Sequence, residues 1–386
     1  MNVVPELSSE TTYSGAVNAQ AAAGELSVQG SGQDVSPDFH RDNSEKMIGG
    51  ESCQCSVSVI VISFNTRELL RECLQSLLDE CGRTEGVTAE ILVVDNTSTD
   101  GSSEMVEREF CNCARTPVRL IRSEVNLGFG MANNLAIKRA QGRYILLVNS
   151  DAFLHRGALG RAIKYMDDNP RTGLGGGRLV GRDGAWQPSG RCFHTIWGDA
   201  LVLSGLSARF PRSRIFGAPD RTWADQNLAA EVDWVPGAFL IMRREVLNRT
   251  GLFDPRFFLY YEETDLCRRV KAAGFSVSYW PDVVVTHIGG ESGRKLKSLS
   301  GSKAVSRVEL WRMRSTLLYY RKHHGWQARL ALWLELMVYG LRQIRNKPSS
   351  DPARRARAEE ASTLASMMRQ AWRETSGGRV SPPAPW

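Results

Sequence analysis

The sequence predicts an α/β protein with a doubly wound, mostly parallel sheet, helices on both faces and a helical extension at the C-terminal end. Two patterns predict this fold class. Short, almost continuous apolar runs alternate with stretches whose apolar residues recur at helical spacing from residue 57 to residue 149. A parallel strand buried on both faces needs the first pattern, and a helix packed on a sheet needs the second. The length of 386 residues allows one large domain with additions.

The first half repeats strand and helix in turn. In chain order we expect a strand from Val57, a helix over 67–78, a strand over 90–95, a helix over 102–110, a strand over 118–122, a helix over 131–140 and a strand over 144–149. Three of these strands end on polar groups, at Ser63 and Asn65, at Asp95, and at Asn149 to Asp151. Ligands of such sheets bind beyond the carboxyl ends of the strands, so these groups should meet in one crevice.

The second half is less regular. After Asp151 we expect a helix, followed by a glycine-rich run over 173–177 and a long loop over 182–230. An apolar segment over 232–246 leads to a helix that begins near three acids and stops at Gly274. A strand over 275–286 then ends on His287, which should join the same rim. We expect this half to face the acceptor.

Composition sets the domain boundaries. Residues 1–55 are rich in Ser, Gly, Ala and Gln, which predicts a disordered tail. We assign 56–293 to the main domain, with 56–151 as a nucleotide-binding half and 152–293 as an acceptor and metal half. Residues 294–347 carry thirteen basic residues against two acids, which predicts a basic amphipathic helical extension. Residues 348–386 should form a C-terminal helix and a flexible tail.

The helical extension has two interpretations. A helix over 311–344 would align apolar residues at near-helical spacing: Trp326, Leu330, Trp333, Leu334, Met337 and Leu341. Together with Arg329, Arg342 and Arg345 this stripe favours docking on an anionic membrane surface. Packing on the domain or on a second subunit, as in a homo-oligomer, is the alternative. No window is apolar and long enough to span a bilayer.

The cysteines and the N-terminal residues bear on location. The eight cysteines fit neither a zinc site nor a small disulfide scaffold, which favours a reducing compartment. The first 25 residues show no secretory signal. We therefore expect a cytoplasmic protein, peripheral on the inner face of the cell membrane if the extension docks there.

Several polar residues are candidates for chemistry. Asp151 beside Asn149 suits a hard divalent cation, although an Asp at a strand end also caps helices. Asp95 could accept a hydrogen bond from a pyrimidine ring, or it could cap the next helix. The loop at Asn126 and Gly128 lacks the third glycine and the acidic partner of a dinucleotide site.

Three carboxylates lie within four residues, at Glu262, Glu263 and Asp265. Mutual repulsion at a pocket wall would raise at least one pKa toward the working range of a general base. A solvated helix face is the alternative. His287 is either a metal ligand or a hydrogen-bonded structural residue.

Seven segments occur together in a specific order. They are 61–65 (VISFN), 93–102 (VVDNTSTDGS), 126–130 (NLGFG), Asn133 with Asn134, 149–151 (NSD), 233–239 (DWVPGAF) and 253–267 (from FDP to DLC). In this order they resemble the inverting glycosyltransferases of family 2, which share the GT-A fold. The segments 183–191 (DGAWQPSGR) and 287–292 (HIGGES) look most like the rhamnosyltransferase branch, which builds cell-wall and surface polysaccharides.

The resemblance implies a role for each matching residue. It implies a nucleotide-diphosphate sugar donor, dTDP-L-rhamnose in the rhamnosyltransferase branch, and a saccharide or lipid-linked saccharide acceptor. Ser63, Asn65 and Asp95 would hold the nucleoside, with Asn126, Gly128 and Asn149 also on the donor side. Asp151 and His287 would hold Mn²⁺ or Mg²⁺ on the diphosphate, and Trp234 and Gly237 would line the acceptor site. The catalytic base would be Glu263, Glu262 or Asp265.

Two departures from the family pattern affect these roles. Ser150 stands where the metal motif usually has Pro, and Glu262–Glu263 stands where the family usually has Glu-Asp. The choice of base among the three acids therefore stays open. An inactive scaffold that binds nucleotide sugars or glycans is the alternative function. Nucleic acid is not an expected partner.

Overall fold

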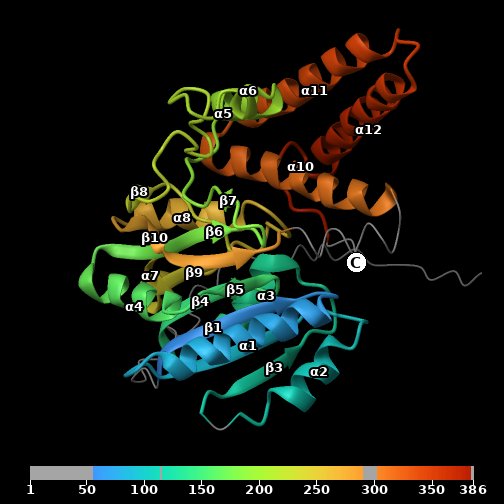
Figure 1. Ribbon diagram of the computed structural model, residues 1–386. Helices are drawn as coiled ribbons and strands as arrows, with labels where there is room; N and C mark the ends of the chain where they lie inside the picture. Colours follow the sequence, from blue (N-terminus) through green and yellow to red (C-terminus); the bar gives the residue numbers. More distant parts are fainter. Residues whose placement is uncertain (1–54, 114, 290–301, 384–386) are drawn as a thin grey trace, which may run out of the picture. The chain divides into compact units, whose positions relative to one another are not determined.

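The computed structural model describes residues 55–113, 115–289 and 302–383. The expected tail over 1–55 therefore lies almost wholly outside the described residues. A single mixed sheet forms the centre, with the strand order β3-β2-β1-β4-β9-β6-β10-β5. Two short strands lie outside this order: β7 pairs with β6, and β8 pairs with β10. Helices cover both faces of the sheet (Figure 1).

The first half has the expected alternation of strands and helices. Its elements are β1 (Cys55–Ser63), α1 (Arg67–Arg83), β2 (Ala89–Asp95), α2 (Ser102–Glu109), β3 (Val118–Arg122), α3 (Gly128–Ile137) and β4 (Gly142–Asn149). The four strands are parallel, and Ser63 pairs with Asp95 while Ile62 pairs with Asn149. This register brings the polar strand ends to one edge of the sheet, as the sequence predicts.

The second half adds mixed strands. Its elements are β5 (Ala152–Leu154), α4 (Ala158–Asp168), β6 (Thr172–Val180), β7 (Trp186–Gln187), α5 (Ile196–Leu203), α6 (Leu206–Arg209), β8 (Ala230–Val232), β9 (Phe239–Arg243), α7 (Arg244–Thr250), α8 (Glu262–Ala272) and β10 (Ser276–His287). The helix expected directly after Asp151 starts later, because residues 152–154 pair with the end of β10.

The glycine-rich run over 173–177 is part of strand β6. A Cβ on Gly175 would lie 2.0 Å from the indole of Trp280, and one on Gly176 would lie 2.7 Å from Val235. The glycines therefore leave space for large side chains that cover the middle of the sheet.

Each face of the sheet has its own apolar core. Val59 and the apolar side chains of α1, α2 and α4 pack on one face, while Ile60 and those of α3, α7 and α8 pack on the other. Neighbouring residues of a strand point to opposite faces, so a continuous apolar strand serves both cores.

The C-terminal part consists of α10 (Ser302–His324), α11 (Gln327–Asn346) and α12 (Pro352–Glu374). The expectation of one helix over 311–344 is wrong, because the chain turns at Gly325, where φ is +59°. α10 is the packed helix: Trp311, Tyr319 and Tyr320 are at most 2% exposed. The three helices lie together, drawn in orange and red in Figure 1. Among the described residues, no helix is long and apolar enough to cross a membrane.

Candidate active site

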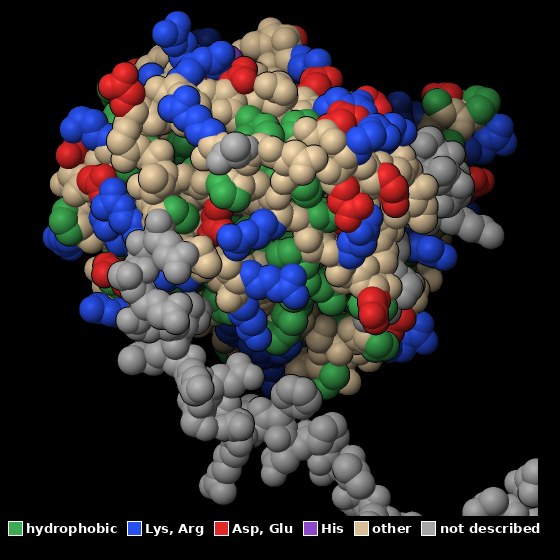
Figure 2. Space-filling view, turned by 90° about the horizontal axis from the view of Figure 1, so that it is seen from below, with side chains coloured by type: hydrophobic (Ala, Val, Ile, Leu, Met, Phe, Trp, Pro, Cys, Tyr) green, Lys and Arg blue, Asp and Glu red, His purple; other side chains and the backbone are tan. Residues whose placement is uncertain are grey.

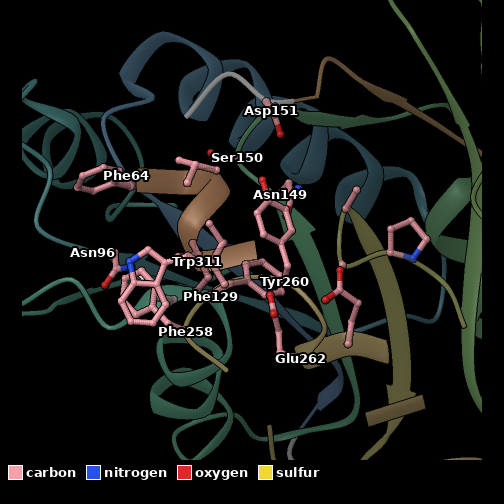
Figure 3. Close-up of a pocket in the computed structure, with 18 of the residues that line it drawn as sticks. Phe64, Asn96, Phe129, Asn149, Ser150, Asp151, Phe258, Tyr260, Glu262 and Trp311 are labelled. Atoms are coloured by element: carbon pink, nitrogen blue, oxygen red, sulfur yellow. Dashed lines mark hydrogen bonds between the residues drawn. The ribbon is translucent and has the colours of Figure 1, made fainter. Parts of the chain in front are cut away.

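A cavity of about 350 Å³ lies at the carboxyl ends of β1, β2 and β4. Its walls come from four parts of the chain that are distant in sequence: the strand ends, the start of α3, the turn before α8, and α10. Figure 3 shows Asn149, Ser150 and Asp151 toward one end and Glu262 toward the other. Its lining residues are Ile62, Phe64, Asn96, Asn126, Gly128, Phe129, Asn149, Ser150, Asp151, Pro236, Gly237, Ala238, Phe258, Leu259, Tyr260, Glu262, Glu263, His287, Val308 and Trp311.

Asp151 and His287 meet at one end of this cavity. The imidazole Nε2 of His287 lies 3.5 Å from Oδ1 of Asp151 and 3.4 Å from Nδ2 of Asn149. The pairing of β5 with β10 causes this meeting, because His287 faces Ala152, and the Ile288 N–H donates to the carbonyl of Asp151. The two predicted metal ligands are therefore adjacent, although they are 136 positions apart in the chain.

The surroundings of His287 suit a metal ligand. Its Nδ1 lies 3.1 Å from Oε1 of Gln187, an acceptor that favours a proton on Nδ1 and leaves Nε2 toward Asp151. Burial lowers the pKa of His287, against the opposing effect of the Asp151 carboxylate. A neutral imidazole is the form that binds a cation. No group of three or more His, Cys, Asp or Glu in the described ranges is arranged to hold a metal, so phosphate and water oxygens would complete the shell.

The acidic pair stands at the start of α8. Tyr260 and Tyr261 precede it with φ of +68° and +70°, a left-handed conformation that non-glycine residues seldom adopt. Asn65 and Thr97, at the ends of β1 and β2, also have positive φ. Strained backbone of this kind tends to gather at functional sites, because the surrounding structure must hold it in place.

Glu262 and Glu263 both line the cavity. Burial raises the pKa of Glu262 well above its ordinary value, and the charge of Glu263 adds to the rise. Burial also raises the pKa of Glu263, but the backbone at Gly237 and the charges of Arg191 and His194 oppose the rise. One carboxylate oxygen of each residue is buried without a hydrogen-bond partner in the described part of the chain. Both can therefore accept a bond from a ligand.

Asp265 does not line the cavity. Its carboxylate is fully buried and contacts Arg269 at 2.9 Å, Lys322 at 2.5 Å and His323 at 2.7 Å. Burial alone would raise its pKa, yet the bond from His323 and the charges of Arg269 and Lys322 outweigh that effect and lower it. Since Lys322 and His323 belong to α10, Asp265 joins α8 to the C-terminal helices.

A polar network links the end of β2 to the start of α3. Asn96 accepts from the Leu127 N–H at 2.8 Å, and its amide donates to Asn126 at 2.9 Å. The oxygen of Asn126 also accepts from the Gly128 N–H at 2.9 Å. Asn126 and Gly128 are thereby held on the cavity wall beside Asn149.

Gly128 is also where this wall meets the turn before α8. The Phe129 N–H donates to the carbonyl of Phe258 at 3.0 Å. A Cβ on Gly128, whose φ is +73°, would lie 2.1 Å from that carbonyl oxygen. The approach is so close that only glycine fits.

The three residues expected to hold a nucleoside lie behind the cavity wall. Ser63 is fully buried next to the hydroxyl of Thr66, and Asn65 accepts from the Thr99 N–H at 2.8 Å. Asp95 accepts from the Ser98 N–H at 3.3 Å through Oδ2. Its Oδ1 is buried without a hydrogen-bond partner among the described residues, so one acceptor is left for a ligand.

The two expected acceptor residues differ in position. Gly237 lines the cavity, and a Cβ there would lie 2.6 Å from the ring of Phe129. Trp234 is buried outside the lining, where its indole N–H donates to the carbonyl of Cys192 at 2.9 Å.

Sequence reasoning missed an aromatic part of the wall. Phe64, Phe258, Tyr260 and Trp311 line the cavity, the last from α10 (Figure 3). Tyr260 lies two residues before the acidic pair, so its place could have been inferred. Trp311 has no such signal, because only the packing of α10 brings it to the site.

Comparison with known proteins agrees with this fold and site. The family profile described as "Glycosyl transferase family 2" matches residues 58–249. The mixed sheet with helices on both faces and its converging polar strand ends are those of the GT-A fold. The chain belongs to glycosyltransferase family 2.

Two curated relatives are rhamnosyltransferases. The N-acetylglucosaminyl-diphospho-decaprenol L-rhamnosyltransferase of Mycobacterium tuberculosis is 26% identical over 249 residues, which cover 61% of this chain and 76% of that protein. A rhamnosyltransferase of Escherichia coli is 27% identical over 205 residues, covering 50% of this chain and 69% of that protein.

A solved structure shares the fold. A mannosyltransferase from Pyrobaculum calidifontis, solved with GDP-Man and Mn²⁺, matches with a TM-score of 0.50 at 17% identity. The match covers 82% of this chain and 87% of that one.

Proposed function

We propose that this chain is a metal-dependent, inverting glycosyltransferase of cell-wall or surface polysaccharide synthesis. The donor we propose is dTDP-L-rhamnose, and the acceptor is a hydroxyl of a saccharide or lipid-linked saccharide. One observation carries the proposal: a candidate cation pair, Asp151 with His287, and a candidate base pair, Glu262 with Glu263, line the same cavity. The names of the curated relatives support the sugar, and the Mn²⁺ in the solved mannosyltransferase supports the cation.

Asp151 and His287 would hold Mn²⁺ or Mg²⁺, with Asn149 beside them. The bound cation would neutralise the negative charge of the leaving diphosphate. Asn126 and Gly128 would contact the donor from the start of α3. The oxygen of Asp95 that has no partner among the described residues would accept the ring N–H of a pyrimidine base, with Ser63 and Asn65 at the same strand ends.

Glu263 is the base in this proposal. Burial raises its pKa, but the backbone groups at Glu263 and Gly237 and the charges of Arg191 and His194 favour its ionised form. Glu262 would then keep its proton, since two adjacent carboxylates in a buried site do not both ionise readily. Asp265 is less suited, because Arg269, Lys322 and His323 already bind its carboxylate. We therefore give it a structural role.

In the reaction, the acceptor oxygen attacks the anomeric carbon while its proton passes to the Glu263 carboxylate. The bond from that carbon to the diphosphate oxygen breaks, and its electron pair leaves with the diphosphate. Attack from the face opposite the leaving group inverts the anomeric centre. Gly237, in the cavity wall, and Trp234, behind it, would shape the acceptor side.

A donor panel tests the proposal. Release of nucleotide should be fastest with dTDP-L-rhamnose when UDP- and GDP-sugars are compared under equal conditions, and EDTA should abolish it. Glu263→Gln should lower turnover by about two to four orders of magnitude, the usual contribution of a general base, and leave donor binding intact. Glu104→Gln, the same change at a residue exposed on α2, is the control. Nucleotide binding without turnover on any donor would favour the inactive scaffold.

A further inference from the structure

α11 exposes a row of large apolar side chains. Trp326, Trp333 and Leu341 are 64%, 62% and 59% exposed, and Met337 and Ile344 continue the row. Their spacing of seven, four, four and three residues places them along one side of the helix. The opposite side is already buried through Ala328, Ala331, Leu334 and Tyr339. Packing within the described part of the chain therefore does not explain the exposed row.

A second exposed apolar group lies on the segment that contains α5 and α6. Trp197, Phe210 and Ile215 are 63%, 46% and 61% exposed. This segment packs on α11, because α5 contacts α11 and the Arg342 guanidinium donates to the carbonyl of Leu203 at 2.6 Å. The elements α5, α6 and α11 lie side by side in Figure 1. We call the exposed apolar residues of both segments, with their flanking arginines, the α5–α11 surface.

The exposed charge of this surface is mostly positive. The segment over 196–219 contains Arg209, Arg212 and Arg214 and one acid, Asp199, whose carboxylate is held by His194 and Tyr320. The acid of α11, Glu335, is 3% exposed and bound to Arg312, so it does not face solvent. Arg212, Arg329 and Arg345 are exposed and form no ion pair in the described part of the chain. By contrast, the face in Figure 2, seen from the side of α2 and β3, has acidic and basic side chains interspersed.

We propose that the α5–α11 surface docks on an anionic lipid bilayer, with its Trp and Leu side chains in the interface and its arginines at the headgroups. The exposed apolar side chains suit the apolar interface of a bilayer, and the arginines around them suit its anionic headgroups. A second copy of the chain fits it less well, because a two-fold interface brings each surface against its own equivalent and sets arginines against arginines. The proposal goes beyond the proposed function, since docking needs no sugar chemistry, but it would hold the cavity near a lipid-linked acceptor.

Vesicle flotation of the full chain tests the proposal. We expect flotation with vesicles of phosphatidylcholine containing about 30% phosphatidylglycerol, loss of binding in high salt, and little binding to phosphatidylcholine alone. The triple variant Arg212→Glu, Arg329→Glu and Arg345→Glu should bind at least about a hundredfold more weakly, because each cation at the surface contributes about fivefold.

The control reverses three cations elsewhere, with the same change in net charge. Lys138→Glu, Arg139→Glu and Arg171→Glu lie outside the surface, are exposed and form no ion pair among the described residues. The control variant should bind vesicles within about threefold of the parent, since the change in net charge alone has a weak effect. Equal loss in both triple variants would show that binding depends on net charge alone and would overturn the proposal.

A second variant tests the apolar part. Trp333→Ser removes a side chain that is 62% exposed, so the fold should survive, and flotation should fall by about tenfold or more. Unchanged flotation of this variant, or no flotation of the parent at low salt, would also overturn the proposal. A parent that sediments as a dimer dissociated by Trp333→Ser would assign the surface to a second copy instead. None of these readouts depends on the donor or on turnover, so they fail or succeed separately from the transferase assay.

Discussion

The carboxylate of Asp265 offers a test that separates a structural acid from a catalytic one. Asp265→Asn keeps the shape of the side chain and removes its charge, which faces Arg269, Lys322 and His323 in a fully buried position. Breaking a buried ion pair by removing one partner costs about 3–5 kcal/mol. The cations here keep other partners, since Lys322 also binds Asp254 at 2.7 Å and Arg269 also binds the carbonyl of Leu252. We therefore expect Asp265→Asn to lower the free energy of unfolding by about 3 kcal/mol, the low end of that range.

The loss converts into a shift of the melting temperature. An unfolding entropy of about 2.1 cal/mol/K per residue over roughly 320 folded residues gives about 0.7 kcal/mol/K, so the variant should melt about 4 °C lower. Turnover of the folded enzyme should stay within about threefold, because the group does not reach the cavity. Scanning calorimetry and a single-temperature rate assay measure both quantities. A large drop in turnover at an unchanged melting temperature would refute the structural role.

The pH dependence gives an independent check. The pKa of Asp265 is lowered from 3.8 on folding, so its charge stabilises the native state above that pH. This contribution is lost as the pH falls through the lowered pKa. The difference in melting temperature between parent and variant should therefore shrink in acid. A difference that is equally large at all pH values would contradict the ionic explanation.

Three further predictions concern the cavity. Glu262→Gln should raise the melting temperature at neutral pH but not near pH 4. Above a pH of about 4.5 the unfolded chain releases the proton of this carboxyl while the folded chain retains it, which favours unfolding, and calorimetry against pH measures this. Asp151→Asn should weaken Mn²⁺-dependent binding of a nucleoside diphosphate by about 10–100-fold in titration calorimetry, while Asp168→Asn on the exposed end of α4 should not. Trp311→Ala should cost about 3–5 kcal/mol in denaturant unfolding, because the indole is 2% exposed, whereas Trp326→Ala should change stability by less than about 0.5 kcal/mol.

The sheet was predictable from the sequence because its strands are long apolar runs with clear ends. The register Ser63 to Asp95 follows from parallel pairing of such runs, and it brings the strand ends together. The run over 173–177 was harder to interpret, since four glycines and one leucine in five residues give no apolar period. Only the tertiary neighbours, such as Trp280 beside Gly175 and Val235 beside Gly176, explain why glycine is needed there.

The site was predictable where its residues are local to a motif. Asp151, Glu262 and Glu263 follow strand or helix boundaries that the sequence marks, and His287 ends a strand. The separation of Asp265 from its two neighbours was not predictable. It depends on helix geometry, since two positions after Glu263 is nearly the opposite side of α8, and on the side chains of Lys322 and His323, which α10 supplies. The contribution of Trp311 to the wall depends on the same docking of α10.

The close contact at Gly128 has a consequence for how the two ends of the site respond to ligand. The Gly128–Phe129 turn and the Phe258 carbonyl touch without room for a methyl group, so neither loop can shift alone. If a donor binds at the α3 turn as proposed, a shift of that turn would be passed through this contact to the Tyr260–Tyr261 turn and the acids behind it. Such a linkage would favour an ordered addition, in which the first substrate aligns the proposed base for the second. It also means that sequence changes in either loop should be tolerated only as matched pairs.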